Sequence, residues 1–484
     1  MVVTIIIKDD KGKQVKSTDF YAKADEKWEE TSYRIGCKVA QEVTQNMLKD
    51  IDEKLYQNRD KKWKSQTFSN RTYVTRFGDV TISRRLYKSK KQYRFLLDEY
   101  LNWLPYQRAT LSLKEALVEL STECSFRKVT DTMSKLTAGV LTKSTIHDLL
   151  TEVSQKAIES EKETYSACFN EGKLAKGGEK KAEILYVESD GLYVHLQREK
   201  DKEGKRLEHY ELKGGIIYDG WKRLPQTSER FALTNKRVYC HSDDSIFFWD
   251  GLSLLADKHW DMSYLKLIVL GGDDAGWINK GAEDLPYCVR QLDGFHLARS
   301  CKRGWKNGLE KNGLEKNGLD MYFAIRSGRV RKTLGKLEER SGKSAIKEGE
   351  HVYKCLDRGV DWRNNVESIV IPEGCRGLGC MESNEDKLFA DRMKKKGMSW
   401  TKTGAKRMGK AIQLAANGDL VDLCGRRATK SLEGYIEDKL SFDLFLYAPE
   451  YEHSVSMPVF SSPYSTQPYA RALRDLSKND YPII

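Results

Sequence analysis

The sequence lacks the cysteine spacing of a zinc site, an apolar run of membrane length and the features of a signal peptide. Ten cysteines are scattered along 484 residues without a CxxC pair, which argues against a zinc ribbon. The richest apolar run, Leu265–Leu270, has the length of a strand, whereas a membrane helix needs about 20 apolar residues. The first residues have neither a basic start nor a small-residue cleavage site. We therefore expect a cytoplasmic protein with reduced thiols and no membrane partner.

The sequence has a modest excess of positive charge: it contains 83 Lys and Arg residues and 71 Asp and Glu residues, which gives a formal charge of +12. Its distribution is more informative than its sum. Basic clusters are typical of a surface that binds a polyanion, although a single cluster is often only a solvated helix face. The clusters are Lys61–Lys64, Arg84–Lys91, Lys302–Lys306, Arg326–Lys336 and Arg392–Lys410.

The chain is long enough for two to four domains at about 100–200 residues each. Changes in composition and in the hydrophobic pattern along the sequence predict four parts. They are an N-terminal helix and β-hairpin region (1–105), a helix-turn-helix domain (106–160), an α/β domain (180–440) with a helical insertion at about 300–362, and a C-terminal tail (441–484). The polar segment Ala157–Lys181 is expected to be the linker before the α/β domain.

The N-terminal region combines a long helix with a hairpin. Apolar residues recur every four positions between Ile35 and Ile51, which indicates a packing face on a helix that ends near Gln57. A β-hairpin is expected over Arg71–Tyr87, with its turn at Gly78–Asp79. Its arginines fit either a phosphate-binding surface or the wet face of a sheet. They are Arg71, Arg76, Arg84 and Arg85.

Residues 110–157 carry the pattern of a helix-turn-helix. Two helices are followed by a short turn that contains Gly139, and Thr142 is a suitable N-cap for a third helix. The first residues of that helix are the expected contacts with the groove of double-stranded DNA, namely Lys143, Ser144 and Thr145. Generic packing of three helices produces the same pattern.

From Ala182 onwards short strands come first and then alternate with helices, which predicts a mixed α/β sheet with flanking helices. Further strands are expected at Leu265–Leu270 and Val366–Ile371, and a helix at Glu382–Met393. A five-residue repeat over Lys306–Asp320 is too short for a solenoid and is interpreted as a tandem duplication in a tolerant surface segment.

Three acidic residues follow strands or begin a helix in this region, namely Asp190, Asp273 and Glu382. Carboxylates that converge from rigid elements can hold Mg²⁺, with Mn²⁺ as an alternative, because these ions prefer oxygen ligands. A pair of such ions activates a water or a 3′-hydroxyl and stabilises the leaving oxygen of a phosphodiester. Taken singly, an Asp at the end of a strand is most often a turn or helix-cap residue.

Five segments in series resemble the ISLre-type insertion-sequence transposases, which are bacterial DDE enzymes. The matching segments are Thr75–Val80, Val187–Gly191, Gly272–Ile278, Leu292–Leu297 and Met381–Asn384 together with Arg392–Met398. The resemblance implies an RNase H-like core whose catalytic, metal-binding triad is Asp190, Asp273 and Glu382. Because Asp274 directly follows Asp273, the second acid could be either of the two, and Asp273 is preferred.

The resemblance also implies supporting residues. Asp293 and His296 match an element that supports the active site or contacts DNA in related transposases. Phe389 stands where many of these enzymes have a basic residue, so Arg392 and Lys396 are the expected phosphate contacts.

The predicted function is therefore that of a transposase. It would bind the terminal inverted repeats of its own element, cut them with Mg²⁺ and transfer the ends into target DNA as a homodimer or larger assembly. Such a protein would be associated with the nucleoid. The alternatives are a non-catalytic helix-turn-helix DNA-binding protein, a nuclease on the same core, and an inactive transposase copy.

Overall fold

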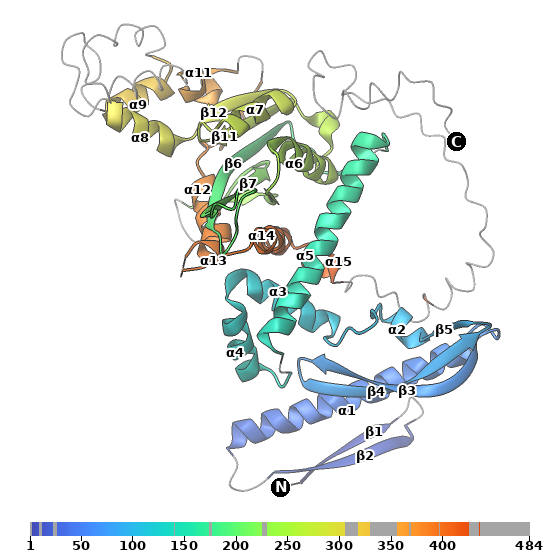
Figure 1. The fold of residues 1–484 in the computed structure, drawn as a ribbon. Coiled ribbons are helices and arrows are strands. Elements are labelled where there is room, and N and C mark those ends of the chain that lie inside the picture. The colour runs from blue at the N-terminus through green and yellow to red at the C-terminus, as the bar shows by residue number, and fades with distance from the viewer. Residues whose placement is uncertain are drawn as a thin grey trace, which may run out of the picture. The chain divides into compact units, whose positions relative to one another are not determined.

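The computed structural model describes residues 2–8, 12–22, 27–139, 141–173, 177–224, 230–304, 318–329, 356–366, 369–395, 397–424 and 435 (Figure 1). The chain forms two compact units. Unit 1 comprises residues 1–153 and 419–453, and unit 2 comprises residues 154–418 and 454–484. No helix in the described ranges is long and apolar enough to cross a membrane. The repeat over residues 306–320 lies almost wholly outside these ranges, as does the tail beyond residue 440.

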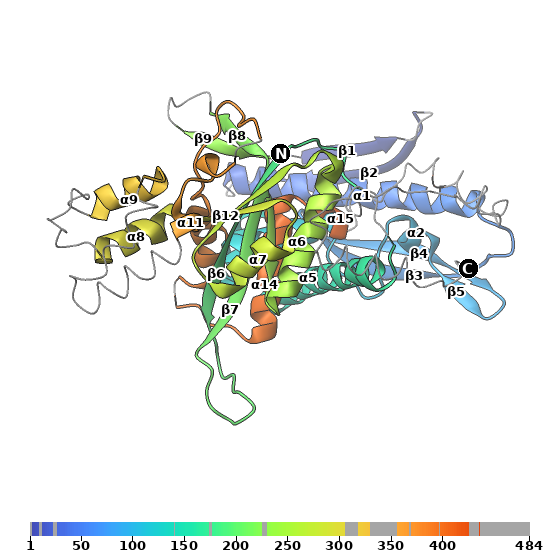
Figure 2. The same ribbon diagram turned by 90° about the horizontal axis from the view of Figure 1, so that it is seen from above.

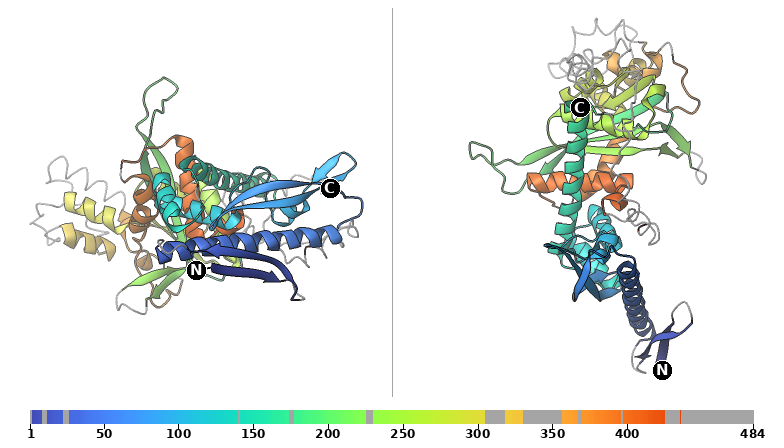
Figure 3. Two further views of the ribbon diagram at one scale, coloured as in Figure 1. Left: turned by 90° about the horizontal axis from the view of Figure 1, so that it is seen from below. Right: turned by 90° about the vertical axis from the view of Figure 1, so that its right-hand side faces the viewer.

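Unit 1 contains two antiparallel β structures, one long helix and a group of shorter helices. Its strands are β1 (Val2–Lys8), β2 (Gln14–Tyr21), β3 (Lys64–Thr75), β4 (Gly78–Ser89) and β5 (Gln92–Arg94). Its helices are α1 (Trp28–Gln57), α2 (Leu96–Tyr100), α3 (Leu111–Glu123), α4 (Phe126–Leu136), the first half of α5 (Lys143–Tyr165) and α15 (Leu420–Leu423). Helix α1 runs between the β1–β2 ribbon and the β3–β4–β5 sheet (Figures 1 and 3).

The buried face of α1 differs from the expected one. Leu48 and Leu55 pack into a core with Tyr73 of β3, whereas Val43 and Met47 are exposed. A spacing of four residues advances about 400° around a helix, so such a series drifts off one face within a few steps. Only part of the predicted series therefore lies on the packing face.

Three of the four arginines of the β3–β4 hairpin form ion pairs within unit 1. Arg71 and Arg84 both pair with Asp98, and Arg85 pairs with Asp52 and Glu53. The guanidinium groups of these three also lie over aromatic rings, for example Arg84 over Phe95 at 3.7 Å. These contacts favour the structural alternative for the three paired arginines, whereas Arg76 is exposed and donates to the Ser112 carbonyl oxygen at 3.1 Å.

Helices α3, α4 and α5 occupy the segment expected to be a helix-turn-helix. Thr142 accepts a hydrogen bond from the Thr145 amide at 3.2 Å, which agrees with its prediction as N-cap. Gly139 of the expected turn is needed for close packing, because a Cβ there would lie 2.2 Å from the Thr75 carbonyl oxygen. Helix α5 continues to Tyr165, so the first part of the expected linker is helical.

Unit 2 is built on a five-stranded mixed sheet with the order β10-β7-β6-β11-β12. Its strands are β6 (Ile184–His195), β7 (His209–Tyr218), β10 (Arg237–His241), β11 (Leu267–Gly272) and β12 (Cys288–Leu292). The pairs β10–β7 and β7–β6 are antiparallel, whereas β6–β11 and β11–β12 are parallel. Strands β8 (Gly220–Arg223) and β9 (Phe231–Thr234) form a separate ribbon (Figure 2). The expected mixed α/β sheet with flanking helices is thus present.

The helices of unit 2 follow or cover this sheet. They are the second half of α5 with the π-helical turn η1 (Ser166–Asn170), α6 (Ser245–His259), α7 (Gly276–Asp284), α8 (Gly294–Gly304), α9 (Gly318–Arg326), α11 (Leu356–Gly359), α12 (Met381–Asn384), η5 (Glu385–Ala390), α13 (Asp391–Met393) and α14 (Lys402–Asn417). Short 3₁₀ turns are η2 (Met262–Tyr264) and η4 (Trp362–Asn364). The strand expected at Val366–Ile371 is not formed by the described residues of that segment.

Two adjacent glycines of β7 show which elements lie on which face of the sheet. A Cβ on Gly214 would be 3.3 Å from Met381 of α12 and 3.6 Å from Phe389 of η5. A Cβ on Gly215 would be 2.9 Å from Phe248 of α6. Because neighbouring strand residues point to opposite faces, α6 covers one face and α12 with η5 covers the other.

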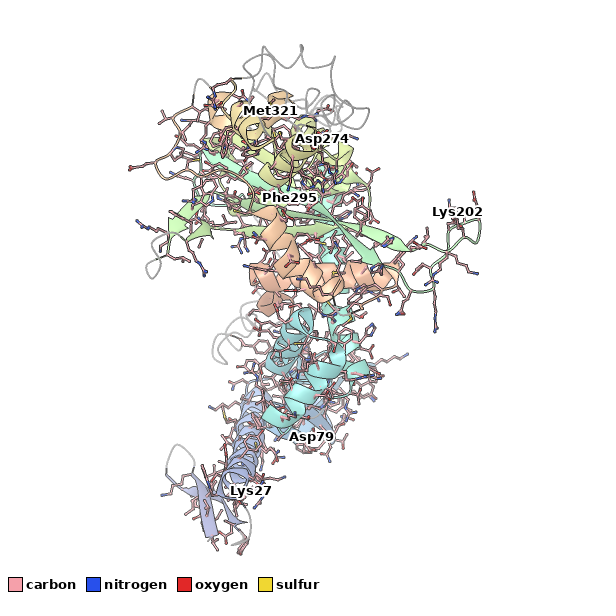
Figure 4. The ribbon with its side chains drawn as sticks, turned by 90° about the vertical axis from the view of Figure 1, so that its left-hand side faces the viewer. Lys27, Asp79, Lys202, Asp274, Phe295 and Met321 are labelled. Atoms are coloured by element: carbon pink, nitrogen blue, oxygen red, sulfur yellow. The ribbon has the colours of Figure 1, made fainter. Side chains whose placement is uncertain are left out.

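Strands β6 and β7 extend beyond the sheet as a long hairpin. Lys202 lies at its tip, far from the helices (Figure 4). Asp201 accepts the amides of Glu203 and Lys205 at 3.0 and 2.8 Å, which closes the turn.

Candidate metal-binding active site

Asp190 lies on β6, at the point where the neighbouring parallel strand β11 ends. Ser189 pairs with Gly272, the last residue of β11, so Asp190 and Asp273 occupy corresponding places on adjacent strands. The Asp190 carboxylate accepts the Gly191 amide at 2.7 Å, and the Asp273 carboxylate accepts the Ala275 amide at 2.9 Å. The carboxyl ends of parallel strands are a common place for ligand sites in α/β sheets.

Burial raises the pKa of Asp190 to about 6. The hydrogen bond from Gly191 opposes this rise, and the nearby charge of Asp273 adds to it. Like charges that are held together by the fold disfavour ionisation of both, and a bound cation relieves this repulsion. The two carboxylates therefore form an acidic site whose donor set suits a divalent cation.

Asp293 and His296 belong to the same acidic region. His296 Nδ1 lies 2.6 Å from an Asp293 carboxylate oxygen, and the His296 amide donates to the other oxygen at 2.9 Å. These hydrogen bonds lower the pKa of Asp293 although burial opposes the shift, and they raise the pKa of His296. The Asp293 amide also donates to the Gly272 carbonyl at 2.8 Å, which fixes this pair beside the end of β11.

The two candidates for the second acid have different surroundings. Asp274 forms an ion pair with Arg358 at 2.8 Å and accepts a hydrogen bond from Asn279 at 2.9 Å. Asp273 is the one whose charge acts on Asp190. Its backbone carbonyl also accepts a hydrogen bond from the buried guanidinium of Arg290, which steadies the turn after β11. These contacts favour Asp273 as the second acid.

Glu382 begins the helical segment that packs against β6 and β7, and its side chain is exposed. Glu385, three residues later, is the carboxylate whose pKa responds to Asp190. Burial raises that pKa, Lys394 at 3.7 Å lowers it, and the charge of Asp190 raises it further. The sequence gives no signal for Glu385, because the π-helical turns of η5 change the angle between successive side chains.

Among the described residues, no three His, Cys, Asp or Glu side chains are close enough to hold a metal ion together. The structure therefore does not bring Asp190, Asp273 and Glu382 together into a metal-binding group.

The expected DNA contacts differ in accessibility. Lys143 and Ser144 are exposed, and Thr145 is half-buried, at the start of α5. Arg392 is only 4% exposed and lies over the Trp400 ring at 5.0 Å, so its expected contact with DNA phosphate is incompatible with its burial. The error came from assuming a regular α-helix between Glu382 and Arg392, where η5 intervenes. Lys396 lies outside the described residues.

Comparison with known proteins gives a family but no activity. A family model described as an uncharacterised protein family (UPF0236) matches residues 26–426. A "UPF0236 protein in vanSb 3′region" from Streptococcus gallolyticus is 24% identical over 372 residues, covering 74% of this chain and 75% of that protein. A UPF0236 protein from Caldanaerobacter subterraneus subsp. tengcongensis is 23% identical over 393 residues, covering 79% of this chain and 75% of that protein.

Two solved structures show weaker similarity. One is the Drosophila P element transposase strand transfer complex, with 12% identity and a TM-score of 0.27 over 78% of this chain and 94% of that one. The other is NurA bound to dAMP and manganese, with 12% identity and a TM-score of 0.12 over 70% of this chain and 82% of that one. Both TM-scores are too low to carry an argument about this chain.

Proposed function

The chain belongs to the uncharacterised protein family UPF0236, and we propose that it is a DDE-type transposase of the ISLre type. It binds the terminal inverted repeats of its own element as double-stranded DNA and cuts them with Mg²⁺ or Mn²⁺. It then joins the resulting 3′-hydroxyl ends to target DNA. Two element ends require at least two active sites, so the working complex is a homodimer or larger. The protein acts in the cytoplasm, at the nucleoid.

The observation that carries this proposal is the acidic site on the sheet of unit 2. Asp190 lies on β6 and Asp273 directly follows the neighbouring parallel strand β11, and burial together with the charge of Asp273 raises the pKa of Asp190 to about 6. A sheet of three antiparallel strands followed by two parallel ones, with the first acid on its central strand, supports an RNase H-like core. The resemblance to ISLre-type transposases adds Glu382 as the third carboxylate.

Each residue has a role in the proposed reaction. The carboxylates of Asp190 and Asp273, with Glu382 from α12 as the third ligand, would hold the divalent cations. Such ions would supply the activation of the attacking hydroxyl and the stabilisation of the leaving oxygen of the phosphodiester. Asp293 orients His296 through two hydrogen bonds and raises its pKa, which favours the protonated imidazole as a positive charge beside the site.

The name of one relative also supports a mobile element, because it combines eleven locus designations in a single genome. A gene repeated in this way is what transposition produces. The exposed start of α5 supplies the DNA-reading surface, with Lys143, Ser144 and Thr145 as its first contacts.

The decisive experiment uses the full chain and labelled duplexes taken from both DNA flanks of its own coding sequence. With Mg²⁺ or Mn²⁺ we expect cleavage at the element ends that leaves a 3′-hydroxyl. Asp190→Asn and Asp273→Asn should each abolish cleavage and leave DNA affinity intact. Asp274→Asn is the matched control and should retain cleavage. If the wild-type chain binds these ends and never cuts them, the protein is better described as a non-catalytic DNA-binding protein. One observation favours this second candidate: the described residues form no metal-binding group of three or more side chains.

A further inference from the structure

Glu188 is a buried carboxylate on β6, two residues before Asp190 and on the same face of the sheet. Its side chain is 1% exposed. The Tyr218 hydroxyl donates to one carboxylate oxygen at 2.7 Å. The backbone amides of Gly379 and Met381 donate to the other oxygen at 2.8 and 3.1 Å. All three donors are uncharged, and two of them belong to the turn that begins α12.

A carboxylate in this environment is costly for the fold. Burial raises the pKa of Glu188, and the hydrogen bonds from Tyr218, Gly379 and Met381 oppose that shift. Leaving such amides unpaired in the interior costs about 1–3 kcal/mol each, so the carboxylate and the turn depend on one another. An apolar residue would fill the same space at lower cost if packing were its only role.

The position of Glu188 connects two parts of the proposed active site. Two residues along a strand span about 7 Å, so Glu188 and Asp190 are carried by one rigid segment. On the other side, Met381 directly precedes Glu382. The hydrogen bonds of Glu188 therefore link the strand of the first acid to the start of the helix that carries the third.

Close packing at the same place reinforces this link. A Cβ on Gly271 of β11 would lie 3.1 Å from Glu188 Cγ and 2.9 Å from Leu378. The glycine lets the turn before α12 approach the sheet closely enough for the two amides to reach the carboxylate.

We propose that Glu188 is a positioning residue that fixes the start of α12, and with it Glu382, relative to Asp190 and Asp273. This inference rests on the proposed function for its catalytic consequence. The role of Glu188 depends on accepting hydrogen bonds and not on negative charge.

The structural arm of the test is hydrogen–deuterium exchange of the full chain without DNA or metal. Glu188→Met keeps the volume and removes both acceptors, so the amides of residues 379–381 should exchange at least tenfold faster. Residues 248–256 of α6, on the other face of the sheet, serve as the internal reference and should keep their protection. Glu188→Gln should restore most of the protection, because its amide oxygen accepts both backbone amides while the Tyr218 hydroxyl turns to accept from its NH₂ group. Tyr218→Phe is the control that leaves the turn amides bonded.

The catalytic arm measures cleavage at saturating DNA over a range of Mn²⁺ concentrations. Loss of a group that orients metal ligands typically costs 10–100-fold in metal affinity or activity. We expect Glu188→Met to raise the half-saturating Mn²⁺ concentration or to lower the cleavage rate by such a factor, with unchanged DNA affinity. For Glu188→Gln we expect both quantities to stay within about fivefold of wild type. Wild-type exchange at 379–381 in Glu188→Met, or complete inactivity of a well-folded Glu188→Gln, overturns the proposal. If the wild-type chain does not cleave DNA at all, the proposed function fails, and the exchange arm still decides whether Glu188 fixes the turn.

Discussion

Asp190 lies on β6 and Asp273 directly follows the adjacent parallel strand β11, and the charge of Asp273 raises the pKa of Asp190. Burial is the larger cause of that rise, which brings the pKa of Asp190 to about 6. The fold thus holds two carboxylates together at a cost to its own stability. Such a cost is expected where a cation is to be bound, because the cation turns the repulsion into attraction.

The first prediction concerns stability against pH. A carboxyl group whose pKa is raised on folding binds its proton more tightly in the folded state, so stability falls as pH rises from about 4 to 6 and stays lower above that range. Asp190→Asn removes this penalty. We expect the variant to be more stable than wild type at pH 7.5 by about 1–3 kcal/mol, and equally stable at pH 4. Urea unfolding at both pH values measures this, and a variant that is less stable at pH 7.5 contradicts it.

The second prediction concerns metal binding. Adding Mn²⁺ at pH 7.5 should raise the melting temperature of the wild-type chain, because an ion that binds only the folded state stabilises it. The effect should vanish in Asp190→Asn and fade below pH 6, where Asp190 holds its proton. Asp274→Asn should keep the effect. An equal shift in the wild type and in Asp190→Asn would place the ion elsewhere.

The third prediction distinguishes the two glutamates of the α12–η5 segment. Glu382→Gln should reduce cleavage at least 100-fold if it completes the metal site, whereas Glu385→Gln should reduce it less than tenfold. The charge of Asp190 contributes to the raised pKa of Glu385, and Lys394 already offsets part of the charge of Glu385. Single-turnover rates of both variants, at equal DNA occupancy, give the answer. The reverse order of effects would assign the third ligand to Glu385.

The fourth prediction concerns DNA binding by the start of α5. Lys143→Ala should weaken binding to the element ends several-fold and lower the slope of log affinity against log salt by about one. Lys162→Ala is a matched change of an exposed lysine on the same helix and should leave both quantities unchanged. Fluorescence anisotropy at 50–300 mM salt, a range of about one decade, makes the comparison. Identical slopes for the two variants would argue against groove contacts by Lys143.

The fifth prediction concerns a lysine from a basic cluster that the fold uses internally. Lys410 is 4% exposed, and its ammonium group contacts both Glu161 oxygens at 2.7 and 2.6 Å and the Gln413 side chain at 2.8 Å. Lys410→Met leaves Glu161 without this partner and should destabilise unit 2 by about 3 kcal/mol. The exposed Lys387→Met should change stability by less than about 0.5 kcal/mol. Denaturant unfolding followed by tryptophan fluorescence reports the difference.

Local patterns in the sequence predicted much of the local structure. The N-cap at Thr142 forms its expected hydrogen bond, since side-chain capping depends only on residues within one turn. The apolar runs at Leu185–Val187 and Leu267–Leu270 are buried strands, because residues apolar on both faces need cover on both sides. Asp273 follows β11 as the pattern predicts, whereas Asp190 lies within β6, which continues to His195.

What only the tertiary structure decided is which charges meet. The sequence marks Arg84, Arg392 and Lys410 as parts of basic clusters, yet burial and partners far along the chain remove them from any outer surface. In the sequence Glu188 is one more acidic residue near Asp190. Only the tertiary structure shows that its carboxylate accepts a hydrogen bond from the amide of Met381, 193 residues away. Hydrogen bonds and ion pairs between distant segments depend on the packing of whole elements. A linear pattern therefore determines the elements and their chemistry, and the packed fold determines which side chains act together.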